Sequence, residues 1–362
     1  MLTKTARMGY HIGVNPRTDN LDRGTAETSG RRFQLRRESK RMNWALAPEA
    51  TPLLLRILLI SAFIALVSAS TTRAGEITLS PEARQAMADI YAGNPDAAIP
   101  IARSIQESES DHPLGYLLEA EADWWNIYCA ACQIKWGMVD DFSHGKRPAH
   151  EAYLKLSDKV IATAKAQLAE SETAEMHLYA GLGYALKARV YDERDEHRNV
   201  ARAGVAARTE FLRALQLDPD LADATAGLGF YNYYVDTLSP IVKILRFFMG
   251  IPGGNKETGI RQMKEGAQNG VLFAVDTRYY LAKNLRTFDL KYADALEIAQ
   301  PLLAKYPHNP IFLLLVGNLN AELGRKDQAA GYFRDALARS VADENCATRI
   351  KDLANAFLDP LN

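Results

Sequence analysis

Small residues recur at fixed places in the C-terminal third of this sequence, and their spacing constrains the fold more than any other feature. Gly317 is followed by Ala329 and Ala336, with the large residue Phe333 between the two alanines, and Ala295 precedes Ala329 by one step of 34 residues. Short side chains at such points allow two successive helices to approach closely, and fixed periods of this length indicate repeated supersecondary units. The pattern therefore predicts stacked helical hairpins.

The rest of the chain after residue 80 also has a helical pattern. Ala, Leu, Glu, Lys and Arg recur at three- and four-residue spacing, and the alternation typical of strands is nearly absent. Two further units are recognisable at Leu182-Gly183 and Leu228-Gly229, each with a delayed second half. Upstream, residues 113–137 and 149–171 predict a longer helical pair. We expect about six pairs in all.

Taken together, these residues resemble the tetratricopeptide repeat (TPR) family over about 260 residues of the chain. The resemblance implies an all-α fold, a right-handed α-solenoid of about six TPR-like helix pairs with a C-terminal capping helix. Residues 227–263 are also similar to the branch of TPR-like proteins that includes mitochondrial outer-membrane inclusion-body-clearance proteins.

The N-terminal segment differs from the rest in charge and hydropathy. The whole chain carries a formal charge of −1, but residues 1–69 contain eleven Lys or Arg and five Asp or Glu. The apolar stretch Ile57–Val67 follows Arg56 and is too short to cross a bilayer, which needs about 20 residues. It precedes small residues, with cleavage points at Ala69 and Ala74, and is typical of a signal peptide.

We therefore expect the protein to be exported to the periplasm. Met42 is an alternative start of the chain. The alternative to a cleaved signal peptide is a short N-terminal anchor that is never cleaved. The expected organisation has five parts. Residues 1–41 are a disordered basic leader and 42–74 a signal peptide. Residues 75–172 form divergent N-terminal helical pairs, 173–341 form TPR-like repeats with inserts, and 342–362 form a capping helix with a tail.

Cys129 and Cys132 lie three residues apart beside several tryptophans. The sixteen or so residues before Cys129 have a helical pattern, whereas a redox CxxC follows a strand and begins a helix. Zinc binding by these cysteines with His144 and His150 is a weak alternative, because a helix-breaking segment separates the histidines. We expect Cys129 and Cys132 to pack in a helix and to form a local disulfide outside the cytosol, with Cys346 single.

The TPR resemblance also implies a set of residues that face the concave side of the solenoid. An extended peptide suits this combination of aromatic rings, cations and amides, since rings stack on it and cations bind its carboxylates. The same frame places Phe230, Tyr234 and Glu322 there, and the alternative is that a bent superhelix buries several of these residues, Phe230 and Tyr234 first. The predicted partner-binding residues are Tyr184, Lys187, Tyr233, Tyr279, Lys283, Arg286 and Asn318.

No arrangement of residues predicts catalysis, a cofactor, a metal site or nucleic-acid binding, and the near-neutral charge argues against the last. The sequence thus favours a non-catalytic scaffold that binds a protein or peptide. Two alternatives are a CxxC-dependent metal or redox protein and a membrane-peripheral protein that uses the apolar insert 239–250, which is too short to span a bilayer.

Overall fold

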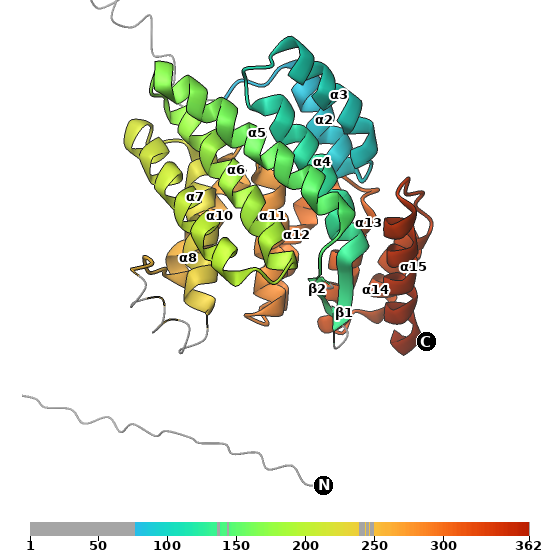
Figure 1. The fold of residues 1–362 in the computed structure, drawn as a ribbon. Helices are drawn as coiled ribbons and strands as arrows, with labels where there is room; N and C mark the ends of the chain where they lie inside the picture. The colour runs from blue at the N-terminus through green and yellow to red at the C-terminus, as the bar shows by residue number, and fades with distance from the viewer. Residues whose placement is uncertain are drawn as a thin grey trace, which may run out of the picture. The chain divides into compact units, whose positions relative to one another are not determined.

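The computed structural model describes residues 77–135, 138–142, 145–238, 243, 246 and 250–361, with only the backbone for 132–142. Figure 1 shows the elements in chain order. They are α2 (Pro81–Ala92), α3 (Pro95–Ser108), α4 (Leu114–Ala131), β1 (Cys132–Lys135), β2 (Met138–Phe142), α5 (Pro148–Glu170), α6 (Ala174–Glu193), α7 (His197–Leu217), α8 (Ala222–Thr237), α10 (Lys256–Asn269), α11 (Ala274–Thr287), α12 (Tyr292–Lys305), α13 (Pro310–Glu322), α14 (Lys326–Leu337), α15 (Glu344–Leu358) and the short 3-10 helix η1 (Asp359–Leu361).

The helices pack in sequence as pairs. Each pair also contacts the next, and α15 covers α14 at the end of the array. This is the all-α solenoid of TPR-like helix pairs with a capping helix that the spacing of small residues predicts. The pairs are α2 with α3, α4 with α5, α6 with α7, α8 with α10, α11 with α12, and α13 with α14.

Small residues make the close packing within a pair possible. A Cβ atom added to Gly317 in α13 would lie 2.6 Å from the ring of Phe333 in α14. Ala329, Phe333 and Ala336 are fully buried on the facing side of α14. The same relation recurs at Gly229 of α8, where an added Cβ would lie 2.8 Å from the backbone nitrogen of Met263 in α10.

The first helices of distant pairs meet inside the array. Helix α4 is buried along most of its length, and its rings pack against α11 and α13. The indole Nε1 of Trp124 donates to the hydroxyl of Tyr280 at 2.8 Å, and the hydroxyls of Tyr128 and Tyr279 lie 2.8 Å apart. The second and fifth pairs are therefore in direct contact, so the array curls far enough for its own helices to fill the inner side.

The start of α13 and the end of α2 are joined in the same way. The Asn309 side chain accepts hydrogen bonds from the backbone N–H groups of Ile311 and Phe312, which caps α13. Its amide nitrogen donates to the carbonyl of Tyr91 at the end of α2, at 2.9 Å. One buried side chain thus begins a C-terminal helix and ties it to the N-terminal pair.

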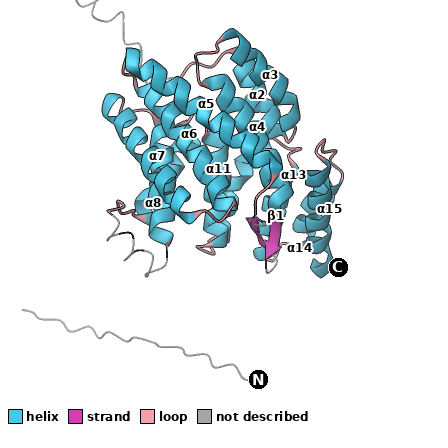
Figure 2. Ribbon diagram, in the orientation of Figure 1, coloured by secondary structure: helices cyan, strands magenta, loops and turns pink. Residues whose placement is uncertain are grey.

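A short antiparallel hairpin departs from the expected all-helical pattern (Figure 2). The helix predicted over 113–137 ends at Ala131, and β1 pairs with β2, with Ile134 opposite Val139. Only Trp136 and Gly137 separate the strands. Two-residue connections with glycine suit hairpins, and β-branched residues suit strands, which explains why the helix stops.

No helix among the described residues is long and apolar enough to cross a membrane. The insert 239–250 lies outside them except for Lys243, Arg246 and Gly250.

Two matched alanine substitutions test the packing of the pairs. Both Gly317 and Gly331 lie inside helices, but an added Cβ at Gly331 would meet nothing within 4 Å. We expect Gly331→Ala to raise the free energy of unfolding by about 0.5–1 kcal/mol through reduced backbone entropy of the unfolded chain. We expect Gly317→Ala to lower it by about 1–3 kcal/mol, because the Phe333 ring is enclosed. Urea denaturation measures both, and equal effects would show that the α13–α14 contact is not close.

Candidate functional site

The residues predicted to face a peptide lie on the inward side of α6, α8, α11 and α13, which we call the inner wall. Most of them are inaccessible. Tyr279, Lys283 and Arg286 of α11 are buried, as are Tyr233 of α8 and Asn318 of α13. Burial was the alternative that the sequence analysis left open for some of the predicted partner-binding residues. It holds for five of these seven residues, and in this conformation those five present no surface to a partner.

Helix α4 covers two of these residues, Tyr279 and Lys283. Trp125 packs edge-on against Tyr279, with ring centroids 5.3 Å apart. The ammonium group of Lys283 lies 5.9 Å from the centroid of the Tyr128 ring. Arg286 donates to the side-chain oxygen of Asn318 and lies 3.5 Å from a carboxylate oxygen of Glu322. The cations and amides predicted to bind a peptide carboxylate thus have partners within the chain.

Two predicted residues, Tyr184 and Lys187 of α6, stay half-buried. The Lys187 ammonium donates to Asp158 of α5 at 2.6 Å, and this hydrogen bond together with the Asp158 charge raises its pKa despite partial desolvation. Lys187 is therefore held at the edge of the inner wall as a cation.

A buried charge cluster lies behind the inner wall and escaped the sequence analysis. The Nη1 atom of Arg189 in α6 donates to both carboxylate oxygens of Glu121 in α4 at 2.9 Å, and its Nη2 atom lies 3.6 Å from Asp276 in α11. The hydroxyl of Tyr91 in α2 donates to the other oxygen of Asp276. Four helices from different pairs therefore meet at one guanidinium.

Aromatic rings enclose the same guanidinium. Its central carbon lies 5.5 Å from the ring centroids of Trp124, Phe273 and Tyr280. Rings at this distance stabilise a cation and exclude water, so the Arg189 charge persists in the interior. No single sequence motif marks this cluster, since the paired residues Glu121 and Arg189 are separated by 68 positions in the sequence.

Two carboxylates and one guanidinium leave an excess negative charge in this interior. Burial raises the pKa of Glu121 well above its ordinary value of 4.5; Arg189 opposes the rise and the neighbouring Asp276 carboxylate adds to it. Burial therefore favours the protonated form of Glu121 more strongly in the folded protein than in the unfolded chain. Arg189, Glu121, Asp276 and Tyr91 contact one another, and these contacts hold their helices together.

Apolar side chains remain accessible along one face of α8 and beyond it. Phe230, Tyr234 and Leu238 are spaced four residues apart, so they share a helix face. Tyr234 is 39% and Leu238 37% exposed, and Phe288 and Leu290, in the loop after α11, are 54% and 60% exposed. We call these five residues the α8 strip.

Several contacts join the parts of the α8 strip. The rings of Phe230 and Tyr234 stack with centroids 6.3 Å apart, and Tyr233 contacts both Tyr234 and Phe288. Leu290 has a φ of +53°, a conformation that a leucine rarely adopts. The chain therefore holds a large apolar side chain in solvent in a strained conformation, which is a hint of function.

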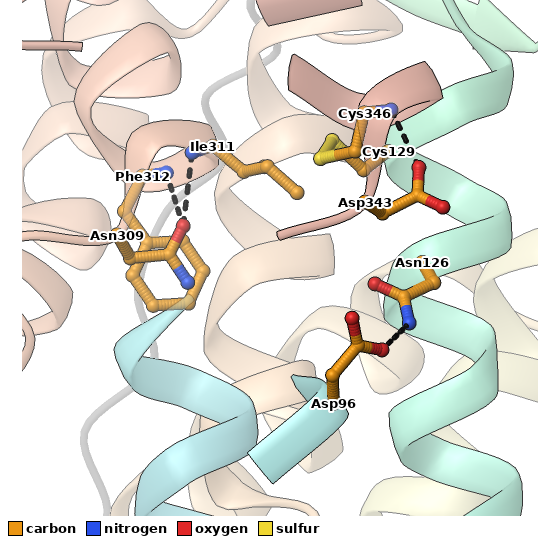
Figure 3. The surroundings of a disulfide bond; sticks show 8 residues. All are labelled: Asp96, Asn126, Cys129, Asn309, Ile311, Phe312, Asp343 and Cys346. Atoms are coloured by element: carbon orange, nitrogen blue, oxygen red, sulfur yellow. Dashed lines mark hydrogen bonds between the residues drawn. A yellow bond between two sulfur atoms is a disulfide. The ribbon is translucent and has the colours of Figure 1, made fainter. Parts of the chain in front are cut away.

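The cysteines pair differently from the sequence prediction. Cys129 of α4 is bonded to Cys346 of α15, with Cα atoms 5.1 Å apart and a sequence separation of 217 (Figure 3). The predicted Cys129–Cys132 bridge is therefore wrong, and so is the expectation of a single Cys346. Helix α4 ends at Ala131, so Cys132 already begins β1, while the curled array brings α15 to Cys129.

The weak zinc alternative fails on the same bond. A disulfide sulfur supplies no thiolate, so Cys129 is no zinc ligand in this structure. A ring nitrogen of buried His150 lies 3.1 Å from the Glu193 carboxylate, to which Arg147 also donates. Within the described ranges no group of three His, Cys, Asp or Glu residues could hold a metal ion.

No protein-family model matches this chain. Among solved structures, it is similar to the C-terminal part of a TPR repeat-containing protein from Cytophaga hutchinsonii, with 17% sequence identity, a TM-score of 0.34, and coverage of 77% of this chain and 88% of that one. The fold assignment comes from the packing described above. The described residues form a TPR-like helical-repeat array.

The Glu121 cluster predicts a dependence of stability on pH. Because the folded pKa of Glu121 is raised, its stabilising effect is complete below about pH 4.5 and is lost as the pH rises toward the folded pKa. We expect the free energy of unfolding to fall as the pH rises above about 4.5, by up to about 1.4 kcal/mol per pH unit. Glu121→Gln should reduce this slope.

Denaturation curves at several pH values test this, with Glu82→Gln as the control. A backbone hydrogen bond and the Ser80 hydroxyl lower the pKa of the exposed Glu82, so its own titration lies below this pH range. An identical slope in wild type and Glu121→Gln would contradict the assignment of the proton to this cluster.

Proposed function

We propose that this chain is an exported, non-catalytic helical-repeat scaffold that binds a protein partner through the α8 strip. The observation that carries the proposal is the exposure of Tyr234, Phe288 and Leu290, with the rings of Tyr234 and Phe288 both packed against the buried Tyr233. Contiguous exposed apolar surface of this kind is typical of interaction sites. The TPR-like fold supports it, because stacked pairs offer long surfaces for partners.

The proposed surface differs from the concave peptide groove that the TPR resemblance implies. Tyr184 and Lys187 of α6, which the resemblance places in that groove, are half-buried and are not part of the α8 strip. The buried part of the wall does not contribute, because Tyr279, Lys283 and Arg286 already have partners within the chain. The partner is therefore expected to contact α8 and the loop after α11, with an apolar side of its own.

Export is the second part of the proposal. The Cys129–Cys346 bond supports it, because disulfides persist in oxidising compartments and are rare in the cytosol. The apolar stretch Ile57–Val67 with small residues after it supports it independently.

Site-specific photo-crosslinking tests the binding surface. A photoreactive residue at position 288 should give one discrete crosslinked species in cells, whereas the same residue at exposed Gln328 of α14 should not. Leu290→Asn should reduce the yield at position 288 at least several-fold while leaving the melting temperature unchanged or higher, because asparagine tolerates a positive φ. An undiminished yield with Leu290→Asn, or equal crosslinking at 328, would contradict the α8 strip as the binding surface.

Cell fractionation tests export. We expect the mature chain outside the cytosol, beginning after Ala69 or Ala74, with Cys129 and Cys346 resistant to alkylation until a reductant is added. Replacing Leu59 and Phe63 by arginine should disrupt the apolar stretch and retain a full-length chain with free thiols in the cytosol. Wild-type protein found in the cytosol with both thiols alkylated would disprove export.

A further inference from the structure

Helix α15 is attached to α4 in an unusual way. It buries Ile350, Leu353 and Phe357 against the array. In the part of the chain that the structure describes, however, no side-chain hydrogen bond or ion pair joins α15 to another helix, and the Nε atom of Arg349 is buried without a hydrogen-bond partner. The contact of α15 with α4 therefore depends on apolar packing and on the Cys129–Cys346 bond.

The packing of this contact is incomplete next to the disulfide. A cavity of about 20 Å³ lies there, with Trp125, Cys129, Ile311, Val341 and Cys346 among its lining residues. The void is large enough for about one water molecule, but most of its lining is apolar. Atoms that border a void lose contacts, so the α4–α15 seam is held less firmly by packing than the closely packed pairs are.

Helix α15 has a separate attachment that does not involve α4. The rings of Phe357 in α15 and Phe333 in α14 stack with centroids 4.9 Å apart. The Asp343 carboxylate accepts from the backbone N–H of Cys346 and caps the helix before the cysteine (Figure 3). The helix and its contact with α14 can therefore persist when the covalent bond to α4 is broken.

We infer that the Cys129–Cys346 disulfide is a redox latch that holds α15 against α4. A dithiol opens it by thiol–disulfide exchange: one thiolate of the reductant attacks a sulfur of the pair, and the other cysteine leaves as a thiolate. The second thiol of the reductant then attacks the mixed disulfide. Two electrons and two protons pass to Cys129 and Cys346, and the dithiol becomes a disulfide.

Reduction of the Cys129–Cys346 bond makes the interface between α4 and α15 more accessible and leaves the packing of the repeats unchanged. Trp125 keeps its contacts with Tyr279 and Phe312, while the side of α4 that carries Cys129 loses its cover. The position of Cys346, three residues into α15 and after the mostly accessible segment 338–343, gives a dithiol a route to the bond through fraying of the first turn.

Hydrogen exchange of the oxidised mature chain, with and without excess dithiothreitol, tests the latch. Reduction should speed exchange in 344–358 and in the last turn of α4 at least tenfold, while α11 and α13 change less than twofold. Cys346→Ser should show the open pattern without reductant. Cys132→Ser removes the third cysteine but neither partner of the bond, so it should match wild type in both states.

Two results would overturn the inference. Unchanged protection of 344–358 after complete reduction, verified by alkylation of Cys346, would mean that packing alone holds α15. Loss of protection throughout 77–361 would mean that the bond maintains the whole fold and does not control one helix.

Discussion

The packing of α4 against α11 and α13 determines how the array closes. Trp124, Trp125 and Tyr128 are all buried there, and a buried aromatic side chain removes about 150–250 Å² from water, worth roughly 4–6 kcal/mol at about 25 cal/mol per Å². An open superhelix would leave these rings in solvent. Closure is thus favoured by the same apolar area that a peptide ligand would otherwise cover.

Closure also decides where charge can reside. Bringing Glu121, Arg189 and Asp276 together removes three charged groups from water, which is unfavourable unless each has close partners. The bidentate contact, the surrounding rings and the raised pKa of Glu121 meet that requirement. The three residues come from different pairs, so their ion pairs form only at one curvature of the array. The packing of α4 is non-directional and does not by itself impose that curvature.

The sequence predicts what depends on neighbouring residues along the chain. The spacing of Gly317, Ala329 and Ala336 predicts the α13–α14 hairpin because helix approach within a pair is local and needs small residues. The helix predicted over 113–137 missed the β1–β2 hairpin, although Ile134 and Val139 are β-branched residues that favour strands.

Contacts between distant pairs could not be predicted in this way. The pairing of Cys129 with Cys346 spans 217 residues, and spacing alone cannot assign connectivity among three cysteines. The burial of Lys283 and Arg286 likewise depends on the curvature, which the delayed second halves of two repeats alter. A 34-residue frame gives the direction in which a residue faces, but it does not say whether another helix of the chain lies there.

The α8 strip is accessible for a reason that follows from this closure. With the inner wall filled, the exposed apolar side chains of α8 and of the loop after α11 are the surface that we propose for a partner. The hydroxyl of Tyr234 lies 3.2 Å from the side-chain oxygen of Asn284, and that of Tyr233 donates to Asp289 at 3.1 Å. These bonds fix the polar ends of both rings, while only the Tyr234 ring is exposed. A surface fixed in advance loses little conformational entropy on binding, so even a small strip can contribute substantially to affinity.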